Sequence, residues 1–424
     1  MIIRSISGVR GLVKTHLTEE TVTSYAQALH VFLGSGIIMA GRDSRQSGET
    51  LLNAFNRELV RLGRNVINCG IVPTPTIQYM VEHSDAAGGI IVTASHNPEE
   101  WNGLKFVRSE GTFFNSQDCD DLFSLVDQNK NVSNAEINGL ELPDQNSILK
   151  HTLKVLSLSC LNLNSIRDRH FKVVVDAVNG AGSEALPGLL EKMGCEVVRL
   201  YCSPNGDFPR GAEPLPENLG DLCETVLREN AHVGFAIDPD ADRLACVSDL
   251  GIPLGEEYTL VLAAEGYMKV KGIKETFVTN LSTSLALEKT AEIYGCRVER
   301  SAVGEINVVQ RMIEIGAELG GEGNGGVILK EAHLGRDSLV AAALVLNRMS
   351  QSSNTLNNIH KNLPVFKIVK DKVNLKGLDL PLFWQKVKEQ FQDGDINKMD
   401  GLKFTWDNSW IHLRPSNTEP ILRI

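Results

Sequence analysis

Short apolar runs alternate along the chain with polar, glycine-rich turns and with longer stretches that have helical periodicity. The pattern is clearest in three segments, each of which starts and ends on an apolar run and has a glycine shortly before the second run: residues 36–67, 171–198 and 276–298. A glycine at that position ends a helix, and the apolar residues after it start a strand. Strand–helix–strand units of this length predict largely parallel sheets covered by helices.

The three segments lie roughly a hundred residues apart, which is too long a period for a solenoid and predicts three related α/β domains with mixed, largely parallel sheets. The last part of the chain differs from them and is typical of a smaller α+β lobe. It has an apolar run at 365–369, a predicted helix near 380–391, and short predicted strands around Phe404 and Ile411. Polar joints separate these parts. We therefore expect four domains around a central cleft, at residues 1–147, 148–250, 251–353 and 354–424.

Composition and charge narrow the class of protein. A chain of 424 residues with 42% hydrophobic and 22% charged residues is an ordinary globular protein, and its net charge of -11 disfavours binding to nucleic acid or to an anionic membrane. The apolar run at 339–346 is far too short to cross a bilayer and predicts a buried helix. Arg4 and Arg10 interrupt the N-terminus before the core of a signal peptide can form. The eight cysteines include no C-x-x-C pair, which is typical of reduced thiols, so we expect a cytoplasmic protein.

The most informative motif is the serine loop, residues 93–98, with the sequence Thr-Ala-Ser-His-Asn-Pro. It places Ser95 just after a predicted strand, with His96 beside it and Lys105 ten residues further along. A hydroxyl at the end of a buried strand, close to an imidazole and an amine, indicates an activated nucleophile. A polar turn with an incidental serine explains this segment equally well. The Gly-x-Ser-x-Gly elbow of serine hydrolases is absent from it.

The metal loop, residues 238–243, follows another predicted strand and carries Asp238, Asp240 and Asp242 in alternation, with Arg243 directly after them. Three carboxylates in this pattern can converge on one hard cation such as Mg²⁺. An EF-hand is excluded because its sixth loop position is Arg243 instead of glycine. A solvated acidic turn explains the pattern less well, since such a turn needs no third aspartate. An aspartate-nucleophile phosphatase also places Asp-x-Asp after a strand, but it gives the serine loop no role.

Two further loops favour recognition of a phosphorylated sugar. The sugar loop, residues 319–326, is rich in glycine and offers Glu322 and Asn324 to hydroxyl groups, although a flexible loop explains its composition equally well. The phosphate loop, residues 414–423, presents hydroxyl and amide donors between two arginines, which suits a bound phosphate. Its candidate ligands are Arg414, Ser416, Asn417, Thr418 and Arg423. Near the N-terminus, glycines on both sides of Arg10 indicate an arginine positioned in a cleft.

Together, and in this order, the four loops resemble the α-D-phosphohexomutase family, which includes phosphoglucomutase/phosphomannomutase and phosphoglucosamine mutase. The resemblance covers essentially the whole chain and implies a four-domain architecture. It implies a phosphoserine at Ser95, a metal held by that group and the three aspartates, and substrate binding by the sugar and phosphate loops. Arg10 and Lys105 match family positions proposed for proton transfer or charge stabilisation.

Three features depart from the family pattern. Many members have a serine at the position of Asn324 and a histidine at that of Gly326, and some have a histidine at that of Glu305. The segment that continues from the sugar loop, with His-Leu-Gly-Arg-Asp at 333–337, resembles a divergent branch often assigned as phosphoglucosamine mutase. The chain ends at Ile424, directly after the phosphate loop, so we expect a shortened last lobe.

The resemblance implies a mutase that interconverts hexose 1-phosphate and hexose 6-phosphate through a phosphoserine and a 1,6-bisphosphate, which also serves as activator. Glucosamine, mannose and glucose phosphates stay open as substrates, and so do a monomer and a homodimer. An aspartate-nucleophile sugar phosphatase and a non-catalytic sugar-phosphate binding protein are the alternatives. The expected catalytic residues are Ser95, Lys105, Arg10, His96 and Arg243.

Overall fold

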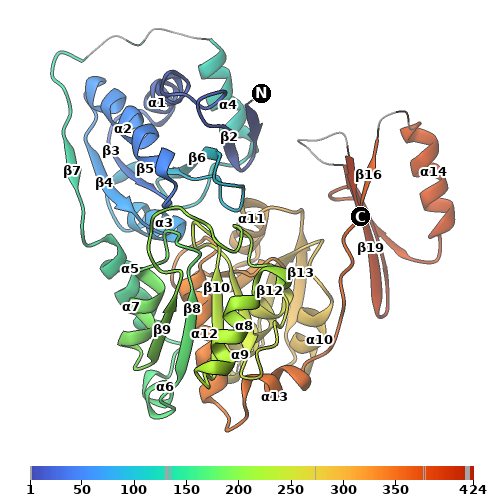
Figure 1. Ribbon diagram of the computed structural model, residues 1–424. Helices are drawn as coiled ribbons and strands as arrows, with labels where there is room; N and C mark the ends of the chain where they lie inside the picture. The colour runs from blue at the N-terminus through green and yellow to red at the C-terminus, as the bar shows by residue number, and fades with distance from the viewer. Residues whose placement is uncertain are drawn as a thin grey trace.

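Four sheets follow one another along the chain in the computed structural model, which describes residues 2–128, 132, 135–272, 274–375, 377, 379–415 and 421–424. Three of the sheets and their helices form the main body, and the fourth lies to one side of it (Figure 1). This arrangement confirms the predicted fold class of three α/β domains with mixed sheets and a smaller C-terminal lobe. The expected boundaries after residues 147, 250 and 353 stay predictions.

The first sheet has seven strands in the order β1-β2-β6-β5-β3-β4-β7, with parallel pairing from β5 to β7 and antiparallel pairing from β5 to β1. Successive side chains of a strand point to opposite faces, so Ile90 and Val92 join the core under three helices while Ile91 packs under the fourth, α3. The strands are β1 (Ile3–Ser5), β2 (Gly8–Leu12), β3 (Ile37–Arg42), β4 (Val66–Ile71), β5 (Ala86–Val92), β6 (Trp101–Arg108) and β7 (Glu141–Pro143). The helices are α1 (Glu19–Leu33), α2 (Gln46–Arg61), α3 (Thr74–Glu82) and α4 (Ser116–Asp127).

The second and third sheets each have four strands, in the orders β11-β10-β8-β9 and β13-β12-β14-β15. Each is parallel except for one antiparallel pair, β10 with β11 and β14 with β15. The strands are β8 (Lys172–Asp176), β9 (Glu196–Leu200), β10 (Val233–Ile237), β11 (Leu244–Ser248), β12 (Thr276–Asn280), β13 (Arg297–Ser301), β14 (Leu319–Glu322) and β15 (Gly326–Leu329). Their helices are α5 (Ser147–Leu156), α6 (Leu163–Asp168), α7 (Ala185–Lys192), the 3₁₀ turn Pro216–Asn218, α8 (Gly220–Arg228), α9 (Glu257–Lys271), α10 (Ala286–Ile293), α11 (Glu305–Ile315), α12 (Ser338–Ser350) and α13 (Leu356–Lys361).

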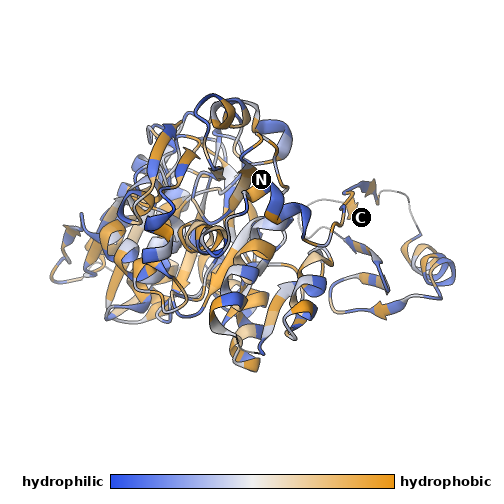
Figure 2. Cartoon of the chain, turned by 90° about the horizontal axis from the view of Figure 1, so that it is seen from below, coloured by the Kyte–Doolittle hydropathy of each residue, from blue (hydrophilic) through white to orange (hydrophobic). Residues whose placement is uncertain are grey.

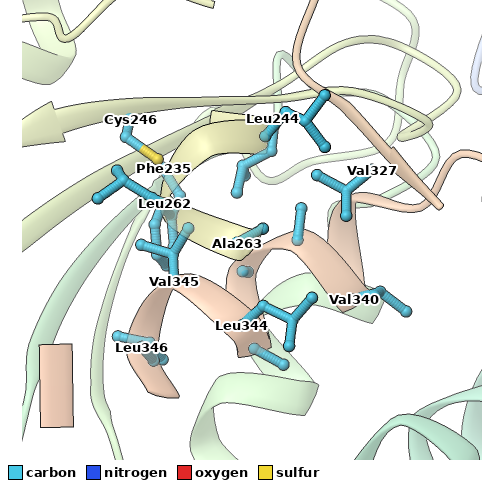
Figure 3. Packing of buried hydrophobic residues seen from close by; sticks show 14 of the residues in the cluster. Phe235, Leu244, Cys246, Leu262, Ala263, Val327, Val340, Leu344, Val345 and Leu346 are labelled. Atoms are coloured by element: carbon cyan, nitrogen blue, oxygen red, sulfur yellow. The ribbon is translucent and has the colours of Figure 1, made fainter. Parts of the chain in front are cut away.

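One continuous hydrophobic core joins the second and third sheets. Figure 3 shows Phe235, Leu244 and Cys246 of the second sheet beside residues of α9 and α12 and Val327 of the third sheet. Helix α12 is apolar on most of its circumference and is buried along nearly its whole length, which confirms the buried helix predicted from the run at 339–346. Since both sheets share these helices, the loops at their strand ends are held in a fixed relation to one another.

The C-terminal lobe is a five-stranded antiparallel sheet in the order β16-β20-β19-β18-β17, covered by α14, with a small core of its own. Seen from below, it lies beside the main body (Figure 2). The apolar run at 365–369 forms no strand: Val365 and Val369 are 74% and 76% exposed, and this segment connects the lobe to the main body. The elements are β16 (Lys372–Asn374), α14 (Leu380–Gln390), β17 (Asp395–Asn397), β18 (Leu402–Trp406), β19 (Ser409–Pro415) and β20 (Ile421–Arg423).

Candidate active site

Ser95 follows β5 in a conformation that few residues adopt. Its φ is 51°, in the left-handed region. This conformation costs a non-glycine residue on the order of 1 kcal/mol, so it persists only where neighbouring groups hold the backbone in place. The hydroxyl of Thr93 accepts the Ser95 N–H at 2.9 Å, and Arg45 donates to the Ser95 carbonyl at 2.8 Å. Asp43 is buried, pairs with Arg45 and accepts from the Thr93 hydroxyl at 2.6 Å. The serine loop is therefore fixed from β3 as well as from its own strand.

The three aspartates of the metal loop come directly after β10 and are fully buried, with ligand atoms within 4.8 Å of one another. The hydroxyl of Ser95 lies 3.4 Å from Asp238 Oδ2. Because β5 and β10 end at the same side of the molecule, two loops 143 residues apart meet at this contact.

The hydrogen bonds of this cluster leave two carboxylate oxygens without a partner. Lys105 Nζ lies 2.6 Å from Asp240 Oδ2, and Arg336 Nη2 lies 2.6 Å from Asp242 Oδ2. The Oδ1 atoms of Asp240 and Asp242 are buried and have no hydrogen-bond partner. Unsatisfied buried oxygens of this kind are costly unless a cation occupies the space between them. The residues therefore fit a divalent metal ion.

The pKa shifts of Asp238 and Asp242 also favour a bound cation. Burial and the neighbouring carboxylates of Asp242 and Asp240 raise the pKa of Asp238 well above its usual value. Burial also opposes ionisation of Asp242, but the charges of Arg336 and Lys105 outweigh it and lower the pKa of that carboxyl. Like charges held this closely in the absence of metal favour a cation that neutralises them.

The predicted basic residues surround Ser95. His96 Nδ1 lies 3.2 Å from the Ser95 hydroxyl and 3.2 Å from Arg243 Nη2. Partial burial and the charges of Arg243 and Arg10 lower the pKa of His96 to about 2, so the ring is neutral near pH 7. Arg10 donates to Asn97 of the serine loop at 2.7 Å. Burial opposes the charge of Lys105, but Asp240 and Asp242 outweigh it and raise its pKa, so the amine stays protonated.

The sugar loop meets the metal loop from the side of the third sheet. Glu322, at the end of β14, accepts from Asn280 at 2.7 Å, from the Gly304 N–H at 3.1 Å and from Arg336 at 2.7 Å. Asn324 lies beside it, with its amide 3.4 Å from the carboxylate. Glu322 is only 3% exposed, and its carboxylate is held ionised in one orientation.

A cavity of about 620 Å³ lies between the sugar loop and the C-terminal lobe. Glu322 and Asn324 line it from the main body, and Arg414 and Arg423 line it from the lobe. The remaining predicted ligands of the phosphate loop, Ser416, Asn417 and Thr418, lie outside the described residues. The predicted residues that the structure describes thus form two groups, one around Ser95 and one around this cavity.

Arg336 connects the two groups, and the sequence alone did not identify it as a site residue. In the sequence it is only one position of the His-Leu-Gly-Arg-Asp segment. Its guanidinium contacts Asp242, Glu322 and Glu305. The sequence does contain a pattern that could have indicated this role of Arg336. Glu305 and Gly326 are two of the positions that depart from the family pattern, and both lie against Arg336.

The chain is similar to known proteins over most of its length. Models of the phosphoglucomutase/phosphomannomutase alpha/beta/alpha domains I, II and III match residues 2–133, 150–251 and 255–366. A phosphoglucomutase/phosphomannomutase of Thermococcus kodakarensis is 34% identical over 98% of this chain and 92% of the relative. The chain belongs to the α-D-phosphohexomutase family.

Further relatives of this phosphohexomutase support the same family. A probable phosphoglucosamine mutase of Methanopyrus kandleri is 32% identical over 99% of this chain and 92% of the relative. The crystal structure of a phosphoglucomutase/phosphomannomutase family protein from Burkholderia thailandensis is similar with a TM-score of 0.85 at 26% identity, covering 99% of this chain and 93% of that chain. The predicted family and enzyme class, an isomerase of the phosphohexomutase type, are confirmed, and nothing favours the phosphatase or the silent binding protein. Among the described residues, no helix is long and apolar enough to cross a membrane.

Proposed function

We propose that this phosphohexomutase interconverts hexose 1-phosphate and hexose 6-phosphate by passing a phosphoryl group between Ser95 and the sugar. The observation that carries the proposal is the buried Ser95 hydroxyl 3.4 Å from Asp238, in a cluster with two carboxylate oxygens that accept no hydrogen bond. In the first transfer the bond from phosphorus to Ser95 Oγ breaks as phosphorus bonds to the free sugar hydroxyl, which loses its proton to solvent. The 1,6-bisphosphate that results is the intermediate. In the second transfer the bond from its other phosphorus to the sugar oxygen breaks as that phosphorus bonds to Ser95 Oγ, and the sugar oxygen takes up a proton from solvent.

Asp238, Asp240 and Asp242 would hold Mg²⁺ together with an oxygen of the phosphorylated Ser95. Bound Mg²⁺ supplies a Lewis acid that neutralises charge on the transferred phosphoryl group. Lys105 and Arg243 add fixed positive charge, and Arg10 holds the serine loop through Asn97. Because Lys105 stays protonated, it stabilises charge and accepts no proton.

The substrate would occupy the cavity between the sugar loop and the C-terminal lobe. Glu322 and Asn324 are positioned to accept from and donate to sugar hydroxyls, and Arg414 and Arg423 are positioned to bind the phosphate that is not transferred. Ser416, Asn417 and Thr418 are proposed to complete the phosphate site. Both ends of the hexose must reach Ser95 in turn, so the intermediate has to reorient within this space.

Phosphopeptide mapping tests the proposal. After incubation with glucose 1,6-bisphosphate, which we propose as the activator, the phosphate should be found on Ser95, and its absence there contradicts the scheme. Coupled assays with the 1-phosphates of glucosamine, mannose and glucose, compared as kcat/KM, identify the preferred substrate. Steady release of inorganic phosphate without isomerisation would favour the phosphatase instead.

We further propose a cytoplasmic enzyme that is a monomer or a homodimer. The burial of most of its eight cysteines supports a reducing compartment. Light scattering on the purified protein distinguishes the two oligomeric states.

A further inference from the structure

Arg336 lies at the junction of the metal loop and the sugar loop, in the turn that leads into α12. It is only 8% exposed, and each of its three guanidinium nitrogens lies near a different carboxylate. Nη2 lies 2.6 Å from Asp242 Oδ2, Nη1 lies 2.7 Å from Glu322 Oε2, and Nε lies 3.0 Å from Glu305 Oε2. One planar group therefore contacts a proposed metal ligand and a proposed sugar ligand at once.

These contacts determine how the carboxylate oxygens are used. At Asp242, Arg336 and Lys105 share Oδ2, whereas Oδ1 accepts no hydrogen bond and has only Arg243 Nε as an ion-pair neighbour, at 3.7 Å. At Glu322, Arg336 binds Oε2 while Asn280 and the Gly304 N–H bind Oε1. Residues that hydrogen-bond to a metal ligand in this way fix its orientation. In other metal sites, their loss weakens metal binding by roughly 10- to 100-fold.

The surroundings are built to admit this side chain. A Cβ atom on Gly326 would lie 2.2 Å from Arg336 Cδ, so any larger residue there displaces the arginine. Glu305 pairs with the guanidinium and also accepts the Arg336 backbone N–H at 3.2 Å. The glycine and the glutamate that depart from the family pattern are thus the space and the partner that Arg336 needs.

We propose that Arg336 is a positioning residue that orients Asp242 for the metal and Glu322 for the sugar, so that both sites depend on one guanidinium. The inference rests on the proposed function for the roles of Asp242 and Glu322. A lysine cannot replace it, because an ammonium group is a single point of charge and lacks the planar pair of Nη donors that hydrogen-bonds to Asp242 and Glu322 at once.

The test compares Arg336→Gln and Arg336→Lys with the wild-type protein. Calorimetry on enzyme stripped with EDTA measures the Kd of Mn²⁺ without any turnover, and a coupled assay at saturating Mg²⁺ measures KM and kcat for the hexose 1-phosphate. We expect Arg336→Gln to raise both the Kd and KM by about 10-fold or more. Arg336→Lys should restore at most one of the two constants, since it can contact Asp242 or Glu322 but not both.

Two further variants separate positioning from stability. Gly326→Ala keeps the guanidinium but forces it to move, so it should raise both constants as well, and it decides the question where Arg336 variants do not fold. Arg348 is the matched control: it is 6% exposed and pairs with Glu265 within the shared core. Arg348→Met should lower the melting temperature and leave the Kd and KM unchanged.

Wild-type values of the Kd and KM in folded Arg336→Gln overturn the inference, as does a change in only one of the two. A loss of stability alone, as in Arg348→Met, also overturns it. A wild-type protein that neither binds the cation nor isomerises hexose phosphate refutes the proposed function and the inference with it. Normal wild-type activity together with unaltered variants refutes the inference alone.

Discussion

Among the described residues, two buried clusters of three potential metal ligands differ in their carboxylates, because only one of them has carboxylate oxygens that accept no hydrogen bond. The first is the aspartate triplet of the metal loop. The second, the histidine cluster, consists of His151 on α5 and of His333 and Asp337 just before α12, and each residue is at most 1% exposed. Both clusters bring their ligand atoms within 4.8 Å of one another, the range expected of a metal site.

The difference lies in how the oxygens are used. Asp337 Oδ2 lies 2.8 Å from His151 Nε2 and 3.2 Å from His333 Nε2, and Oδ1 accepts the Leu339 N–H at 2.8 Å as the N-cap of α12. Both oxygens are occupied by protein donors. In the metal loop, by contrast, Oδ1 of Asp240 and of Asp242 accepts no hydrogen bond. Burial of titratable groups therefore does not by itself indicate a cation site; buried carboxylate oxygens that accept no hydrogen bond do.

The largest expected contrast is between the hydroxyls at the two clusters. Ser95 faces the aspartates, and Thr76 lies 3.0 Å from His151 Nδ1. We expect Ser95→Ala to lower kcat on the order of 10⁴-fold or more in a coupled isomerase assay, as removal of a nucleophile does, with little change in melting temperature. Thr76→Val should do the reverse, costing about 1 kcal/mol of unfolding free energy while retaining turnover. Isomerisation by Ser95→Ala would contradict the role of the serine.

The second-largest expected contrast is the effect of a bound metal ion on stability. Addition of MgCl₂ to EDTA-stripped wild-type protein should stabilise it by about 2.7 kcal/mol at a concentration 100 times the Kd, seen as a rise in melting temperature. Asp240→Asn should abolish most of this rise, because it removes a ligand and half of the charge that faces Lys105. His333→Gln is the control and should leave the rise unchanged. A metal-dependent rise that His333→Gln removes would place an ion in the histidine cluster.

The third contrast concerns stability without metal. Asp337→Asn should lower the unfolding free energy by about 3 kcal/mol, because an amide has one acceptor oxygen and cannot accept from both histidines and from the Leu339 N–H. Asp238→Asn should be neutral or stabilising in EDTA, because it removes one of three carboxylates that repel one another. Urea denaturation of both variants measures the difference. Equal losses in the two variants would show that the clusters do not differ in this way.

The smallest expected effect is a difference in pH dependence. Burial opposes ionisation of Asp337, but His151 and His333 outweigh it and lower its pKa, so its stabilising effect is full above the unfolded value of about 3.9 and is lost as the pH falls through the lower folded value. The pKa of Asp238 is raised, so its contribution is greatest below the unfolded value and is lost as the pH rises through the folded value.

Urea denaturation in EDTA between acid and neutral pH measures both trends. The stability gap between wild type and Asp337→Asn should narrow toward acid pH, and the gap between wild type and Asp238→Asn should widen toward neutral pH. Gaps that stay constant across this range would contradict the predicted pKa directions.

The sequence by itself determined the features that depend on residues close together in the chain. Apolar runs ending at Val92 and Ile237 predict strands, and the polar loops after them predict the nucleophile and the metal ligands. A phosphate loop in a separate lobe and a glycine-rich sugar loop are likewise local patterns. These motifs, in this order, were sufficient for the family and the fold class, because each strand, turn and loop is specified within a few residues.

Only the tertiary structure decided how the loops act on one another. Arg336 contacts Asp242 across 94 residues of chain, and His151 contacts Asp337 across 186, and no local pattern predicts either pair. The same holds for the choice of which carboxylate oxygens have partners and which are free, since the donors come from separate sheets. Packing of three sheets at one junction brings these donors together, and it separates a site that can bind a cation from a cluster whose carboxylate already has a donor at each oxygen.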